Sequence, residues 1–123
     1  RGLGDVYKRQ ILPLSVLTFV ENAVKYGVQS QKTLLISIRV SLLPGETPED
    51  TYVCITILDN GPGFPEDLLH FLNKEEFAEE KTAGIGIQNV WKRIKIRYEE
   101  KATILYSNSN GACVEMYLPY EKY

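Results

Sequence analysis

A glycine-rich turn placed directly after a strand-like segment constrains the fold more than any other feature of this sequence. Residues 53–58, VCITIL, form an apolar run, and residues 59–64, DNGPGF, follow at once. Gly61 and Gly63 permit positive φ, and the proline between them fixes its own φ and lacks an N–H donor. The turn therefore presents the Asp59 carboxylate at the end of a strand, as an acceptor for a ligand amine. An ordinary strand-ending turn has the same composition, so both interpretations stand at this point.

A largely apolar helix is predicted from Leu12 to Tyr26, with proline at an early position and Gly27 as its C-terminal cap. Its apolar residues cover most of the circumference, which is typical of a helix buried on several sides. One polar stripe at three- and four-residue spacing interrupts them: Ser15, Thr18, Asn22, Lys25 and Tyr26. Because buried polar groups need hydrogen-bond partners, the stripe indicates a face that binds a hydrated anion. A solvated surface face is the alternative.

A second glycine cluster, GIGI at residues 84–87, runs into a predicted helix. Glycines at the start of a helix expose backbone N–H groups where the helix dipole favours an anion, so this segment can hold a phosphate. The alternative is that these glycines only ease the backbone conformation where the helix begins. The charged segment from Asn73 to Ala83 has the composition of a solvated surface helix or loop. Only its position between the two glycine motifs supports the alternative, a lid.

The remaining patterns predict strands and one short helix. Leu35 to Leu42 alternates as a half-buried strand, with the run ending at Leu58 as its antiparallel partner. A short helix follows Pro65, and an Asn-Gly turn joins Thr103–Tyr106 to Cys113–Leu118 as a hairpin. We therefore expect an α+β fold, a two-layer sandwich in which a mixed, mostly antiparallel sheet carries three helices on one face.

Composition excludes some classes of function and limits the folded part. The net charge is −2, which argues against a nucleic-acid binder, and a single histidine, His70, excludes a histidine cluster. Residues 5–10, DVYKRQ, match the translation of a transposase mosaic-end adapter. We therefore expect residues 1–10 to be an adapter-derived leader outside the fold, with a natural polar leader as the alternative, and residues 11–123 to form one domain.

Three segments together resemble a known family. ENAVKYG at residues 21–27, DNGPGF at 59–64 and GIGIQNV at 84–90 resemble the N, G1 and G2 boxes of the Bergerat-type ATP-binding domain, in particular that of LytS/YesM-type sensor histidine kinases. The resemblance implies transfer of the ATP γ-phosphoryl group to a histidine on a dimerisation domain, and then to a response regulator. It also implies a homodimeric, membrane-anchored kinase in which this domain is cytoplasmic.

The resemblance implies roles for individual residues. Glu21, Asn22 and Lys25 would form the catalytic group, and Asn22 would bind Mg²⁺ through its amide oxygen, a hard donor that suits this ion. Asp59 would accept a hydrogen bond from the adenine amine. The residues implied to contact the nucleotide are Asn22, Lys25, Tyr26, Asp59, Gly61, Gly63, Phe64, Gly84, Ile85, Gly86 and Ile87.

Some features depart from the family pattern. No phosphoacceptor histidine is present, since His70 lies in a short helix between the boxes, and the first strand and helix of the domain are expected to be missing upstream of Ile11. Ala112 stands where related domains often carry a threonine near the adenine-binding aspartate.

Other functional classes share these boxes. Gyrase/MutL-type ATPases use a glutamate one helical turn before the Mg²⁺-binding asparagine as general base, and here that position is Thr18. Anti-sigma-factor serine kinases commonly carry an acid there too. A non-catalytic nucleotide sensor or interaction module is the remaining alternative.

Overall fold

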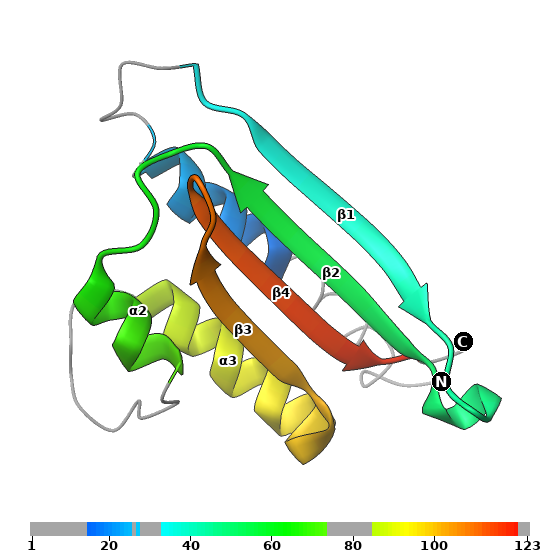
Figure 1. Ribbon diagram of the computed structural model, residues 1–123. Coiled ribbons are helices and arrows are strands. Elements are labelled where there is room, and N and C mark those ends of the chain that lie inside the picture. The colour runs from blue at the N-terminus through cyan, green and yellow to red at the C-terminus, as the bar shows by residue number, and fades with distance from the viewer. Residues whose placement is uncertain (1–14, 26, 28–32, 74–84, 121–123) are drawn as a thin grey trace.

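A four-stranded sheet with helices on one face makes up the described part of the chain (Figure 1). The computed structural model describes residues 15–25, 27, 33–73 and 85–120. The strands are β1 Ile36–Leu43, β2 Tyr52–Asp59, β3 Thr103–Asn108 and β4 Ala112–Pro119. They lie in the order β1-β2-β4-β3, and each neighbouring pair is antiparallel. The two predicted hairpins are confirmed, and no described pair supplies the parallel part of a mixed sheet.

In the described part of the chain, three α-helices cover one face of this sheet, as the sequence predicted (Figure 1). They are the N-terminal helix at residues 15–25, α2 at Glu66–Asn73 and α3 at Ile85–Tyr98. Short 3-10 helices follow β1 at Pro48–Asp50 and α3 at Glu99–Lys101. None of the described helices is long and apolar enough to cross a membrane. The α+β sandwich is therefore confirmed, while residues 1–14, which include the expected leader, lie outside the described residues.

The core lies between the central strands and the helices. Strand alternation turns Ile55 and Ile57 of β2 toward the helices, and antiparallel register places Met116 opposite Ile55 and Val114 opposite Ile57. The helices contribute the other buried apolar side chains, which include Phe19, Leu68, Leu72, Ile87, Val90 and Ile94. The end of β2 and the start of β4 therefore lie over the N-terminal helix and α3.

The two edges of the sheet differ. Strand β1 leaves its helix-facing row exposed, with Ile38, Val40 and Leu42 at 48%, 67% and 58% exposure. At the other edge, the backbone of β3 instead forms hydrogen bonds with the side chain of Asn73, the last residue of α2. Asn73 Nδ2 donates to Tyr106 O at 2.9 Å, and Tyr106 N donates to Asn73 Oδ1 at 3.2 Å. The amide side chain thus takes the place of a neighbouring strand and fixes α2 against β3.

The position of the core predicts that alanine substitutions at two β-strand positions will lower the free energy of unfolding by very different amounts. Met116→Ala removes a side chain with 0% exposure and should cost about 2–5 kcal/mol of unfolding free energy through lost burial and a residual cavity. Leu105→Ala on β3, where the side chain is 47% exposed, should cost about 1 kcal/mol or less. Urea unfolding followed by the fluorescence of the single tryptophan, Trp91, measures both. Equal losses at the two positions would contradict this placement of the core.

Candidate functional site

Asp59, the last residue of β2, is held so that one carboxylate oxygen is used by the protein and the other is left for a ligand. Its Oδ1 accepts hydrogen bonds from Gly61 N at 2.8 Å and Ala112 N at 3.1 Å. Among the described residues, none donates a hydrogen bond to Oδ2. The residue is only half-buried. The two N–H groups therefore fix the carboxylate and leave an acceptor at the mouth of the strand.

The β3–β4 hairpin supports the glycine-rich turn at both of its ends. At the Asp59 end, Gly111 has φ 143°, and a side chain there would overlap the Asp59 carbonyl oxygen. At the other end, Phe64 N donates to Asn108 Oδ1 at 2.8 Å and Asn108 Nδ2 donates to Phe64 O at 2.9 Å. Gly63 lies between them with φ 83°, which confirms the need for glycine predicted at this position.

The N-terminal helix brings the first motif to this turn. Phe19 and Ala23 are buried on its sheet-facing side, and Asn22 beside them is half-buried. At the end of the helix, a methyl group built on Gly61 would lie 3.6 Å from the Cα of Gly27. This is an ordinary contact distance, so the turn and the end of the helix lie side by side where two of the sequence motifs meet.

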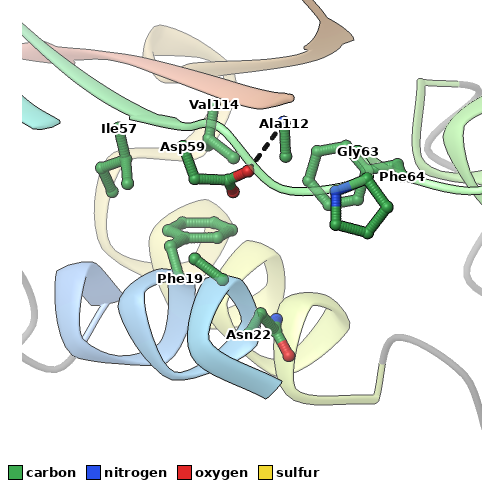
Figure 2. A pocket seen from close by; sticks show the side chains of 10 residues that line it. Phe19, Asn22, Ile57, Asp59, Gly63, Phe64, Ala112 and Val114 are labelled. Carbon is green, nitrogen blue, oxygen red and sulfur yellow. Dashed lines mark hydrogen bonds between the residues drawn. The ribbon is translucent and has the colours of Figure 1, made fainter. Parts of the chain in front are cut away.

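A pocket opens between the turn and the N-terminal helix (Figure 2). Figure 2 shows Asp59 above Phe19, with Gly63 and Phe64 to one side and Asn22 below them near the start of α3. Its lining residues are Phe19, Asn22, Ala23, Ile57, Asp59, Pro62, Gly63, Phe64, Ala112 and Val114. An apolar cavity with one carboxylate and one amide is suited to a planar group that carries a hydrogen-bond donor.

The first turn of α3, which carries part of the third motif, lies beside the N-terminal helix. A methyl group built on Gly86, in the first turn of α3, would lie 3.4 Å from Thr18 Cγ2 on the N-terminal helix. The next residue, Ile87, has its side chain in the core at 1% exposure. Gly84 lies outside the described residues, as does the expected lid up to Ala83, and α3 begins at Ile85. The start of α3 therefore lies against the helix that carries Asn22.

The structure brings four of the predicted site residues into the pocket: Asn22, Asp59, Gly63 and Phe64. Glu21 and Lys25 are exposed on the N-terminal helix outside the lining, and Tyr26 lies outside the described residues. The roles assigned to these residues, and to Gly61, Gly84, Ile85, Gly86 and Ile87, stay predictions.

Sequence reasoning missed the apolar walls of the pocket. Phe19, Ile57 and Val114 line it, yet each also fits the pattern of an ordinary core residue. Ala112 was noted only as a departure from a family pattern, although its N–H fixes Asp59. Strand pairing could have identified one wall, because Val114 lies directly opposite Ile57.

The side chain of Asn22 has an unused hydrogen-bonding capacity. Its Nδ2 atom is buried and, within the described part of the chain, has no hydrogen-bond partner. Such a group costs roughly 1–3 kcal/mol unless a ligand satisfies it. The described residues contain no group of three or more His, Cys, Asp or Glu side chains that could hold a metal by themselves. The unpartnered Nδ2 is a donor and suits a phosphate oxygen, whereas Mg²⁺ would need the oxygen of the same amide together with oxygens of substrate phosphates and water.

Comparisons with known proteins show the family to which a chain with this fold and site belongs. The profile of the family described as histidine kinase-, DNA gyrase B-, and HSP90-like ATPase matches residues 10–122. The chain therefore belongs to this ATPase family.

Individual relatives are sensor proteins. The chain is 31% identical over 115 residues to the sensor protein LytS of Oceanobacillus iheyensis and 28% identical over 116 residues to LytS of Streptococcus agalactiae. These alignments cover 90% and 91% of this chain but only 19% of each relative, so the chain spans about a fifth of their length. The fold is similar to that of a mycobacterial sensor histidine kinase, MprB, with a TM-score of 0.63 and 19% identity over 89% of this chain and 70% of that one.

Two glycines of the site should respond differently to alanine. Gly111→Ala introduces a side chain at φ 143° against the Asp59 carbonyl and should lower the free energy of unfolding by about 3 kcal/mol. Among the described residues, an alanine at Gly86 meets only Thr18, at an ordinary contact distance of 3.4 Å. Gly86→Ala should therefore change the free energy of unfolding by about 1 kcal/mol or less, toward greater stability, because alanine favours helix. Urea unfolding tests both, and a tolerated alanine at position 111 would contradict the close approach of hairpin and turn.

Proposed function

We propose that this chain is the ATP-binding catalytic domain of a sensor histidine kinase, formed by residues 11–123. The domain binds Mg-ATP and donates the γ-phosphoryl group to a histidine on a separate dimerisation domain. One observation carries the proposal: within the described residues, a carboxylate at the end of β2 keeps one free oxygen at the mouth of an apolar pocket, and an amide N–H group that also lines this pocket has no partner. The family match and the LytS relatives support it.

The free oxygen of Asp59 suits the adenine base. Adenine is planar and apolar on its faces, and its exocyclic amine donates hydrogen bonds. Phe19, Ile57 and Val114 supply apolar walls, and Asp59 Oδ2 supplies the acceptor. Because Asp59 is already fixed by two backbone N–H groups, little ordering is needed when the base binds.

The phosphates would lie toward Asn22 and the start of α3. Asn22 would hold Mg²⁺, which when bound neutralises charge on the phosphate oxygens. Lys25, one turn further along the same helix and exposed, would meet a phosphate together with Tyr26. Glu21 would act beside them at the transferred group. The N–H groups that begin α3, from Gly84 to Ile87, would receive the remaining phosphate charge.

The proposed partners follow from the kinase assignment. The intact kinase would be a membrane-anchored homodimer with this domain in the cytoplasm. The phosphoryl group would pass from the histidine of the dimerisation domain to an aspartate of a response regulator. The sensor proteins among the relatives support this proposal.

ATP hydrolysis of the gyrase type is the second candidate, because the family description includes DNA gyrase B. That chemistry needs a base one helical turn before Asn22. Thr18 occupies this position and lies against Gly86 of α3, and a threonine hydroxyl is not a base near neutral pH. The site therefore favours phosphoryl transfer to a protein over hydrolysis.

Asp59→Asn tests the proposed nucleotide pocket. Asparagine keeps an oxygen for Gly61 and Ala112 but replaces the free oxygen with an N–H donor that would face the adenine amine. We expect a loss of ATP affinity of roughly 10- to 100-fold, measured by calorimetry with Mg-ATP. EDTA should weaken binding to the wild-type chain.

Glu46→Gln provides the control, since it removes one negative charge from an exposed loop away from the pocket. It should leave the affinity for ATP unchanged. Wild-type chain that is folded and does not bind Mg-ATP, or an Asp59→Asn variant that binds it normally, would contradict the proposed function.

A further inference from the structure

Asn108, at the end of β3, bonds a segment far away in the sequence. Its side-chain amide accepts from Phe64 N at 2.8 Å and donates to Phe64 O at 2.9 Å, across 44 residues of chain. Both backbone groups of one residue are thus paired with one side chain, as they would be with a neighbouring strand. The contact fixes the position of Phe64 relative to the sheet.

Gly63 makes this contact sterically feasible. A methyl group built on Gly63 would lie 2.8 Å from Asn108 Oδ1, 3.0 Å from Cγ and 3.3 Å from Nδ2. Any larger residue at position 63 would push the amide away from Phe64. The glycine and the asparagine therefore act as one structural unit that joins the turn to the hairpin.

Phe64 carries the effect of this unit into the pocket. Its side chain is 7% exposed and forms part of the pocket wall. Its ring packs edge-on against Tyr106, with centroids 6.0 Å apart and planes at 86°. Tyr106 also packs against Phe19, the facing wall of the pocket, at 6.2 Å. Asn108 and Tyr106 both belong to β3, so one strand positions both aromatic walls.

We propose that Asn108 is a positioning residue for nucleotide binding. It holds the Phe64 end of the turn while Ala112, on the same hairpin, holds the Asp59 end, so the β3–β4 hairpin sets the distance between acceptor and aromatic wall. This inference rests on the proposed function, because the ligand whose binding depends on this distance is the adenine base. Asn108 itself does not line the pocket and acts through Phe64.

Asn108→Ala removes both hydrogen bonds while leaving every lining side chain in place. In the full chain we expect about a tenfold weaker affinity for ATP, measured by calorimetry, and a similar loss for adenosine, measured by competition. Lys25→Ala should instead weaken ATP and leave adenosine unaffected, because its proposed contact is with phosphate. Equal losses for ATP and adenosine therefore indicate the base end of the site and not the phosphate end. Because a lower folded fraction would also weaken both ligands equally, each affinity is corrected for the folded fraction of the variant.

Ser107→Ala is the matched control, because Ser107 is exposed and adjacent to Asn108 but points to the opposite face of the strand. It should bind both ligands as the wild type does. Trp91 fluorescence in urea establishes the folded fraction at the temperature of each titration. Amide hydrogen exchange at Phe64 provides a second measurement, and we expect faster exchange in Asn108→Ala than in the control even if the variant is less stable overall.

The outcomes separate this inference from the proposed function. If the folded wild type binds neither ATP nor adenosine, the proposed function fails and this inference fails with it. If the wild type binds ATP and folded Asn108→Ala binds it equally well, only the role of Asn108 is overturned. If Asn108→Ala is too unstable to titrate, unchanged exchange at the Phe64 amide relative to neighbouring amides would overturn the role.

Discussion

The shared hydrogen bonding of Asp59 Oδ1 is the interaction on which the site depends. One oxygen binds the N–H groups of Gly61 and Ala112, which belong to the turn after β2 and to the start of β4. This joins the turn to the adjacent strand and orients the carboxylate so that its other oxygen remains available. If the carboxylate were free to rotate, the pocket would lose both its polar end and the anchor of the glycine-rich turn. The close approach of Gly111 to the Asp59 carbonyl belongs to the same arrangement.

In the irregular parts of the fold, asparagine side chains also join separate segments by binding their backbone groups. Asn60 accepts from Leu35 N at 2.8 Å and donates to Thr33 O at 2.9 Å, which connects the turn to the segment before β1. The side chain of Asn73 likewise donates to the carbonyl oxygen of Tyr106 on β3 and accepts from its N–H group. Asn108 forms the same pair of hydrogen bonds with the backbone of Phe64. An amide presents one donor and one acceptor side by side, so it can replace a strand where the chain turns away. Three such contacts hold the turn, α2 and the hairpin in fixed relation around the pocket.

The sequence predicted the elements well because their signals are local. Alternation identified the strands, and the Asn-Gly turn identified the hairpin; Asn110 has φ 57°, as such a turn requires. The pocket walls could not be predicted in the same way. Phe19 and Val114 are apolar residues in apolar patterns, and only tertiary packing decides that they face a cavity as well as the core. The contact of Asn108 with Phe64 was equally hidden, since an asparagine near a turn is ordinary and its partner lies 44 residues away.

The most direct test of the central claim compares ATP with inosine triphosphate on the wild-type chain. The two nucleotides differ where adenine has an amine and hypoxanthine has a carbonyl oxygen, the group that would face Asp59 Oδ2. A carboxylate oxygen accepts from the amine and repels the carbonyl, so we predict that calorimetry in the presence of Mg²⁺ will show ATP bound at least roughly tenfold more tightly. Equal affinities, or tighter binding of inosine triphosphate, would contradict the assignment of Asp59 as the residue that recognises the base.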